Sequence, residues 1–186
     1  RDTLAKITAA KENKHIGQVL AEWQSAGDMG TKVHAFIEKT LNGESPVIDR
    51  IGKTVYIHEN EPYFAEYDPT SAEKIWLEWW GMMSKNYKPE KTEWRVCDLE
   101  WGIAGTLDSL MKHRDNNLYV LLDWKTCKTL YKSGDCDAER LKRPFDSLYD
   151  TNTVLFAMQI SLYSLFLIRN TTIDNILPII VHLRRN

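Results

Sequence analysis

Two carboxylates and a lysine could meet near the middle of this chain. Asp108 lies in a stretch that alternates like a strand, residues 103–111, and Asp123 and Lys125 end the next, residues 118–125. Like charges on adjacent strands repel, and a divalent cation bound by their oxygens removes that cost. A lysine beside the ion could position or deprotonate a water, or stabilise charge on a phosphate. These residues predict Mg²⁺ or Mn²⁺ chemistry, with a surface Asp pair and a Lys counter-ion as the alternative.

The turn between the two strands decides whether the three side chains share a face. A two-residue turn at 115–116 places Asp108 opposite Asp123, and a turn at 116–117 places it opposite Lys125. Both registers keep the three residues on one face because side chains alternate along a strand, whereas a turn of odd length would not.

Two further polar pairs are spaced four residues apart, which puts each pair on one face of a helix. His34 and Glu38 form the first. A neutral imidazole is a ligand for ions such as Mn²⁺, and the carboxylate could orient it or bind a second ion. Gln159 and Tyr163 form the second pair, in an apolar stretch where a buried amide needs partners. Ordinary surface pairs are the alternative for both.

The elements that would carry these residues alternate between helix and strand. Helices are expected in the second half of residues 2–23, and over 28–41, 71–83 and 152–169, with Asp28 as an N-cap and Asn42-Gly43 as a stop. Strands are expected over 93–99, 103–111, 118–125 and 176–183, with a short hairpin and a loop in 46–68. Because residues 118–122 are apolar on both faces, they should lie inside the sheet. The order predicts an α/β domain whose mixed sheet is flanked by helices.

Aromatic residues are frequent, and most of them are expected in the core. The helix over 71–83 carries Trp76, Trp79 and Trp80, for which burial is the expected role and base stacking the alternative. Tyr63, Phe64 and Tyr67, in the loop before that helix, are better candidates for exposed aromatics.

Length and composition indicate one globular domain. The chain has 186 residues, of which 43% are hydrophobic and 27% charged. Its cysteines, Cys97, Cys127 and Cys136, are odd in number, which favours a reducing compartment over a disulfide framework. No apolar run approaches the ~20 residues that span a bilayer. The chain begins at Arg1 without an initiator Met, so we expect a fragment of a longer protein.

The net charge of -2 at first argues against nucleic acid as a partner. Some of the acid, however, lies in the candidate site, where a metal would neutralise it. Residues 125–143 also hold six basic side chains against three acidic ones, with Lys128, Lys132, Lys142 and Arg143 among the basic ones. This segment predicts a basic groove for a phosphate backbone, with salt-sensitive binding, and a solvated loop is the alternative.

Four motifs in order resemble the PD-(D/E)XK nuclease superfamily in its RecB-like branch, which includes mitochondrial genome-maintenance exonucleases and related viral or phage proteins. They are G-T-x-x-H-x-x-x-E at 30–38, G-I-A-G-T-L-D at 102–108, L-D-W-K-T at 122–126 and Q-x-x-x-Y at 159–163. Leu107 stands where the superfamily's name has Pro. The resemblance implies a single nuclease domain over 1–186, with a helical region over residues 1–45 and a restriction-endonuclease-like core over 90–186.

The resemblance also implies roles for single residues. His34, Asp108 and Asp123 would bind the metal together with the backbone carbonyl of Trp124, and Lys125 would be the catalytic lysine, beside Asp108 and Asp123.

Four other residues would assist the site by the same resemblance. Glu38 and Glu93 would support it from just outside the metal, and Gln159 and Tyr163 would support it and contact the nucleic-acid backbone. Several RecB-like relatives hold an iron–sulfur cluster on four cysteines, and three cysteines predict no such cluster here.

The implied activity is Mg²⁺- or Mn²⁺-dependent hydrolysis of DNA phosphodiester bonds, by an exonuclease that prefers single-stranded ends. The alternatives are a cap-snatching-type or other RNA endonuclease and a non-cleaving nucleic-acid-binding module on the same fold. Expected partners are nucleic acid, with DNA favoured over RNA, and other domains of a replication or repair polypeptide, but no membrane. The expected setting is a reducing intracellular compartment (cytoplasm, nucleus or mitochondrion), with a viral or phage origin also considered.

Overall fold

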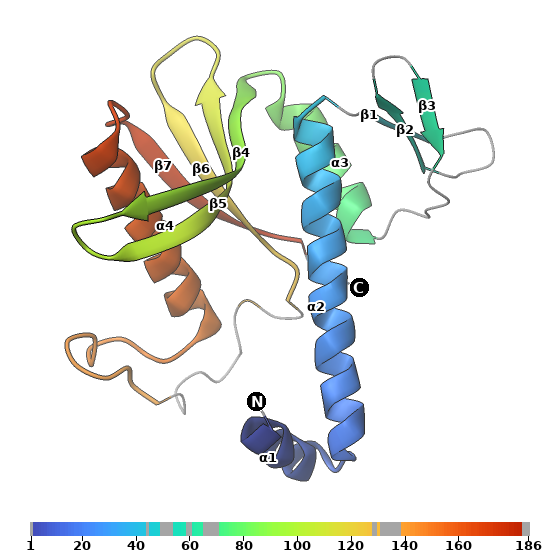
Figure 1. Ribbon diagram of the computed structural model, residues 1–186, viewed down its shortest axis with the longest axis vertical. Coiled ribbons are helices and arrows are strands. Elements are labelled where there is room, and N and C mark those ends of the chain that lie inside the picture. Colours follow the sequence, from blue (N-terminus) through green and yellow to red (C-terminus); the bar gives the residue numbers. More distant parts are fainter. Residues whose placement is uncertain are drawn as a thin grey trace.

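The computed structural model describes residues 2–43, 45–48, 54–58, 61–64, 71–127, 130 and 139–183. Its helices are α1 (Asp2–Glu12), α2 (Ile16–Leu41), α3 (Ser71–Met83) and α4 (Asn152–Asn170). Its strands are β1 (Ser45–Ile48), β2 (Thr54–His58), β3 (Glu61–Phe64), β4 (Tyr87–Asp98), β5 (Ile103–His113), β6 (Tyr119–Lys125) and β7 (Ile176–His182). Figure 1 shows α4 on one face of the larger sheet, and α2 with α3 on its other side.

The larger sheet has the strand order β4-β5-β6-β7. Its first three strands are antiparallel, and β7 runs parallel to β6, so α4 is the crossover between them. This confirms an α/β domain with a mixed sheet flanked by helices. It also confirms that the apolar strand β6 is an interior strand.

The β5–β6 pair has the register that a turn at 115–116 predicts. Its ladder runs from Lys112↔Tyr119 to Ser109↔Leu122. The connecting loop has four residues rather than two, because the His113 N–H donates to the Leu118 carbonyl at 2.9 Å before the chain turns. Since four is also an even number, the register and the strand faces are unchanged.

The core lies on both faces of the larger sheet. On one face, Val33, Phe36 and Ile37 of α2 pack with Trp76 of α3 and with Trp124 of β6. On the other face, α4 packs on the sheet through a cluster of buried aliphatic side chains, namely Leu107, Leu110, Leu121, Ile160 and Leu167. The Trp-rich helix α3 therefore serves the core as expected, with Trp76 fully buried.

The predicted N-cap at Asp28 is wrong, because α2 runs unbroken from Ile16. Its N-cap is His15, whose Nδ1 accepts the Gly17 N–H at 3.2 Å. Asp28 instead accepts a hydrogen bond from Gln24, one turn earlier, at 2.8 Å. A helix-interior glycine such as Gly27 costs only about 1 kcal/mol, which the packing of the following turns outweighs.

The predicted end of α2 is confirmed. The helix stops at Leu41, Asn42 is the C-cap, and Gly43 has φ 93°, a left-handed conformation that glycine adopts without strain.

The segment after α2 forms more strands than expected. Where the sequence predicts a hairpin and a loop, β1, β2 and β3 form a three-stranded antiparallel sheet in that order. Strands of four or five residues carry too little alternation to be recognised singly. The side chains of Tyr63 and Phe64, and all of Tyr67, lie outside the described residues.

At the N-terminus, α1 packs on the first turns of α2. The buried contacts come from Ala5 and Ala9 of α1 and from Val19 of α2.

Among the described helices, α4 alone has the length and composition to span a membrane, with a mean hydropathy of 1.3, although the sequence offers no continuous apolar run. In this fold α4 lies on the sheet and buries Ile160, Phe166 and Leu167.

Candidate metal centre and catalytic lysine

Three side chains from three different elements converge between α2 and the larger sheet. His34 comes from α2, Glu93 from β4 and Asp108 from β5, and one ligand atom of each lies within 4.8 Å of the others. The His34 Nδ1 is 3.6 Å from Glu93 Oε1 and 3.8 Å from Asp108 Oδ1. These separations exceed a hydrogen bond, and they leave room for a shared ion among the three groups.

Close approach of α2 to the end of β6 brings His34 into place. A Cβ on Gly30 would lie 3.3 Å from the Thr126 Oγ1, so a glycine suits this crossing point. One turn later, the Nε2 of His34 is 3.3 Å from the Trp124 carbonyl oxygen. The imidazole therefore has one nitrogen at the β6 backbone and the other facing the two carboxylates.

Glu93 reaches the cluster through an unusual backbone. Its φ is 46°, in the left-handed region that costs a residue with a side chain roughly 1–2 kcal/mol. The residues on either side pair regularly, Thr92 with Ser109 and Trp94 with Leu107, so Glu93 lies opposite Asp108. Strain of this kind is maintained where the surrounding structure requires it, often at functional sites.

Asp108 lies where β5 and β6 separate. Their ladder ends at Ser109↔Leu122. Two residues further along β6, the Trp124 N–H donates to Asp108 Oδ2 at 2.7 Å. Leu107 and Leu110 are three apart yet pack in the same core, so the strand's strict alternation is broken between them. The prediction that Asp108 simply shares a face with Asp123 therefore fails at this irregularity, which turns its carboxylate towards Trp124 and His34.

The charges in the cluster are strongly coupled. The pKa of Asp108 is raised to about 6, chiefly by burial; the nearby Asp123 charge also acts to raise it, while His34, the Trp124 N–H and Lys125 act to lower it. The Glu93 carboxylate beside the ring, more than any other group, raises the pKa of His34, against the effect of burial. A cation among these groups would remove the repulsion between carboxylates.

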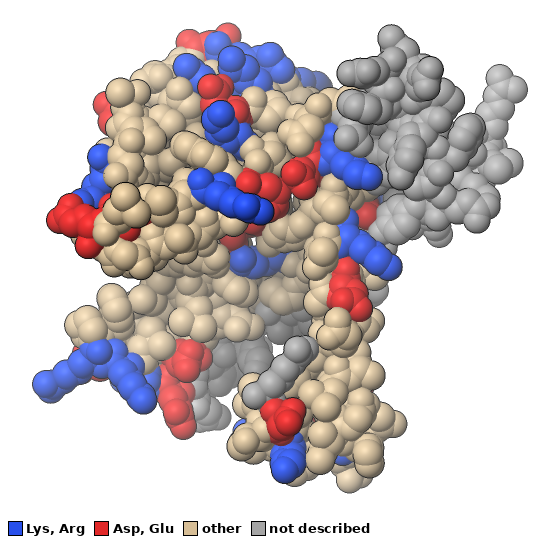
Figure 2. Space-filling model, in the orientation of Figure 1, with Lys and Arg blue, Asp and Glu red and all other residues tan. Residues whose placement is uncertain are grey.

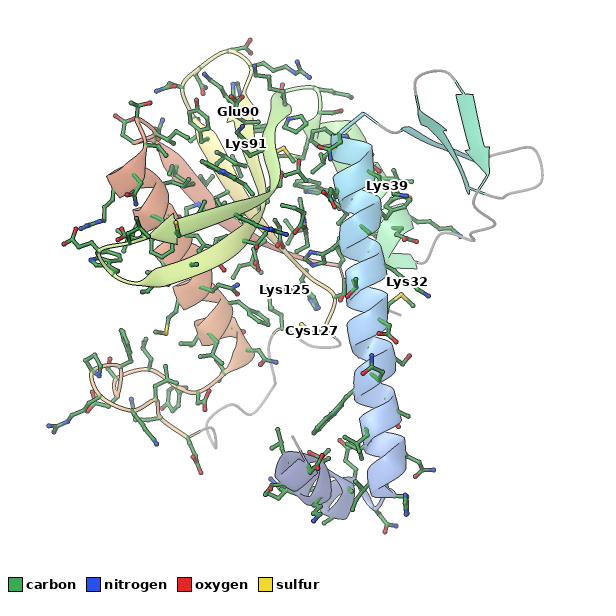
Figure 3. All side chains as sticks on the ribbon, in the orientation of Figure 1. Lys32, Lys39, Glu90, Lys91, Lys125 and Cys127 are labelled. Atoms are coloured by element: carbon green, nitrogen blue, oxygen red, sulfur yellow. The ribbon has the colours of Figure 1, made fainter. Side chains whose placement is uncertain are left out.

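Lys125 and Asp123 form an ion pair next to the cluster, and Figure 3 shows Lys125 at the lower end of β6. The Lys125 Nζ is 3.0 Å from Oδ1 and 2.7 Å from Oδ2 of Asp123, and it lies 4.5 Å from the centre of the Phe156 ring on α4. Asp123 is 5% exposed. Among described residues, no hydrogen-bond donor is aligned with its Oδ2, so the ammonium contact is electrostatic.

Aromatic packing holds Trp124 in place. Its ring meets the edges of Trp76 and Trp79 from α3, with centroids 6.1 and 5.7 Å apart. These contacts matter for the cluster because the backbone of Trp124 binds Asp108 through its N–H and faces His34 through its carbonyl.

Gln159 and Tyr163 interact with each other, as their spacing predicts. The Gln159 Nε2 donates to the Tyr163 Oη at 3.2 Å. Tyr163 also lies against Gly105 of β5, where a Cβ would come within 2.5 Å of the hydroxyl. The pair therefore sits where α4 crosses the sheet, near the strand that carries Asp108.

The remaining predicted site residues lie outside this cluster. Glu38, one turn beyond His34, lines a groove that it shares with Glu93. Lys142 and Arg143 are exposed in the loop before α4, where Arg143 pairs with Asp146.

Two predicted nucleic-acid-binding residues, Lys128 and Lys132, lie outside the described residues, as does Cys136. Cys97 and Cys127 are free thiols.

The donor set of the cluster fits a divalent metal. One imidazole and two carboxylates suit Mn²⁺, and the oxygen donors suit Mg²⁺. The sequence indicates a supporting role for Glu93, whereas the structure places it among the three groups that could hold the ion. A positive φ in a strand leaves no sequence signal at Glu93, so nothing in the chain's pattern could have assigned it.

Comparisons with protein-family models, with curated proteins and with solved structures found no match to this chain.

Proposed function

We propose that this chain is a Mg²⁺- or Mn²⁺-dependent nuclease that hydrolyses phosphodiester bonds of DNA. The observation that carries the proposal is the meeting of His34, Glu93 and Asp108 within 4.8 Å. The Lys125–Asp123 ion pair beside them supplies the lysine that such chemistry uses. Apart from Glu93, these residues stand on the motifs that resemble RecB-like nucleases, and a restriction-endonuclease-like core belongs to the same proposal.

His34, Glu93 and Asp108 would hold the ion, while the Trp124 carbonyl lies at the other nitrogen of the His34 ring. A bound divalent ion supplies polarisation of the scissile phosphate and a lower pKa for an attacking water. Lys125, which is paired with Asp123, would orient that water or stabilise charge that develops on the phosphate. Because the Phe156 ring borders the ammonium, one side of Lys125 is shielded from solvent.

Single-stranded DNA ends are the proposed substrate, and this choice rests on the resemblance. An RNA endonuclease is the second candidate, since the cap-snatching enzymes combine a histidine, acids and a lysine in the same way, and Glu93 adds the further acid. A 2′-hydroxyl contact would separate the two, so the assay must include both nucleic acids.

The test is digestion of end-labelled single- and double-stranded DNA and RNA with Mg²⁺, Mn²⁺ or EDTA. Cleavage is expected only with metal, and Asp108→Asn and Lys125→Met should each lower its rate at least a hundredfold. Lys6→Met, on the exposed surface of α1, is the matched control and should cleave like the wild type. Unchanged cleavage by Asp108→Asn would assign the activity to a contaminant and overturn the proposal.

A further inference from the structure

A groove runs from the metal cluster along the free edge of the larger sheet. It has a volume of about 660 Å³. Its lining comes from β4, from Thr106 of β5 and from Glu38 of α2. Glu93 belongs both to this groove and to the metal cluster, so the two are continuous.

Two cationic side chains line the groove. Lys91 and Arg95 are exposed on β4, and neither forms an ion pair with any residue that the structure describes. Figure 3 shows Lys91 on the upper portion of β4, and Figure 2 shows basic and acidic atoms side by side over this face of the sheet. Unpaired cations beside an acidic centre offer a place for an anion that must come close to a metal.

Hydroxyl groups accompany both cations. Arg95 is the cross-strand partner of Thr106, so a guanidinium and a hydroxyl stand side by side across β4 and β5. Thr92 lies next to Lys91 and also lines the groove. Guanidinium, ammonium and hydroxyl donors are the groups that bind phosphate oxygens in nucleic-acid complexes.

The groove is of a size for a few nucleotides. Its volume lies within the range of roughly 300–1,000 Å³ that pockets for small ligands have. Trp94 lines the same groove while it also packs against the core cluster that includes Leu107, and Lys91 lies 5.9 Å from the centre of its ring. An aromatic ring beside cations is typical of sites for unpaired bases.

From this juxtaposition we infer that the β4-edge groove, defined by Lys91, Thr92, Trp94, Arg95 and Thr106, binds the sugar-phosphate backbone of the single strand that enters the metal site. The inference rests on the proposed function. It assigns the strand to β4, whereas the sequence favours the basic segment 125–143.

Binding of a 5′-labelled oligo-dT to the whole chain tests the groove. Fluorescence anisotropy is measured in Ca²⁺ at 50 and 200 mM salt, with intact strands verified on a gel. The variant is Lys91→Ala/Arg95→Ala, and the control is Lys6→Ala/Lys85→Ala, which removes the same charge from exposed positions elsewhere. Each lost phosphate contact lowers the single-strand salt slope by about 0.7.

The groove variant is expected to bind more weakly than the wild type. Because it lacks two phosphate contacts, the factor by which its affinity falls from 50 to 200 mM salt should be about seven times smaller than the factor for the wild type. The control variant should keep the wild-type affinity and slope. Unchanged binding and slope in the groove variant would overturn the inference, and so would an equal loss of affinity for a blunt duplex. Circular dichroism confirms that both variants fold.

The outcomes separate this inference from the proposed nuclease. If the wild type cleaves DNA and the groove variant binds normally, the nuclease proposal is supported and the groove inference is rejected. If the groove variant binds weakly and the wild type cleaves nothing, the groove inference is supported and the nuclease proposal is rejected. A wild-type chain that binds no single strand overturns the groove.

Discussion

The Asp108 carboxylate accepts the backbone N–H of Trp124 at 2.7 Å, at the first position where β5 and β6 no longer pair. One oxygen thereby replaces a lost strand hydrogen bond, while the other lies 3.8 Å from the His34 ring. A single side chain thus ends the ladder and faces the candidate metal site. Its structural and chemical roles can be separated by two substitutions.

Asp108→Asn should keep the fold and lose metal binding. The amide oxygen can still accept from Trp124, whereas Asp108→Ala leaves that N–H unpaired at a cost of about 1–3 kcal/mol. The free energy of unfolding in urea should therefore be higher for Asp108→Asn than for Asp108→Ala. Calorimetric titration with Mn²⁺ should show that both variants bind the ion at least tenfold more weakly than the wild type. Equal stability of the two variants would show that the contact does not hold the strand ends.

Glu93→Gln should lower the pKa of His34. The Glu93 carboxylate is the main group that raises this pKa, so its neutral replacement removes the attraction for the imidazolium. A metal-free NMR titration of the His34 ring measures the shift directly. Glu38→Gln, on the same helix face but outside the cluster, is the control and should leave the His34 titration close to that of the wild type.

Glu93→Gly should cost little stability while weakening Mn²⁺ binding. Glycine adopts a φ of 46° without strain, which offsets its greater freedom in the unfolded chain. Thr92→Gly, at the preceding strand position, has no such compensation. Denaturant unfolding should find Thr92→Gly the less stable by about 1 kcal/mol, and the opposite order would contradict strain at Glu93.

Gly105→Ala should destabilise the chain, because its methyl group would lie within 2.5–2.8 Å of three Tyr163 atoms. Overpacking of this kind costs about 1–3 kcal/mol. Gly27→Ala has no heavy atom within 4 Å of its Cβ, and in the interior of α2 it should gain about 0.5–1 kcal/mol. Thermal unfolding should shift in opposite directions for the two variants.

Asp98 should make stability depend on pH in the acid range. The Trp101 backbone N–H, foremost, lowers the pKa of this carboxyl below its ordinary 3.8, with help from Asn170 and Arg169. A lowered folded-state pKa contributes stability above pH 3.8 that is lost as the pH falls through the folded value. Asp98→Asn should be less stable than the wild type at pH 7, and this difference should shrink below about pH 4.

Local patterns in the sequence predict much of the framework. The alternation in β5, the apolar run of β6 and the largely apolar stretch of α4 each depend on neighbouring residues only, and all three elements lie where expected. Even the register follows, because any even-numbered loop keeps the same side chains opposite each other. The error at Asp28 arose where local capping preference opposed the packing of a longer helix.

The composition of the candidate site depends on contacts between distant residues. The motifs supply His34, Asp108, Asp123 and Lys125 as candidates, and their residue types already indicate a hard cation. A left-handed φ brings Glu93 into the cluster, and the end of a ladder turns Asp108 towards Trp124. Both are features of strands that meet α2 only in the folded chain. Periodicity in a sequence carries no record of this meeting, since each residue's pattern reports only its own element.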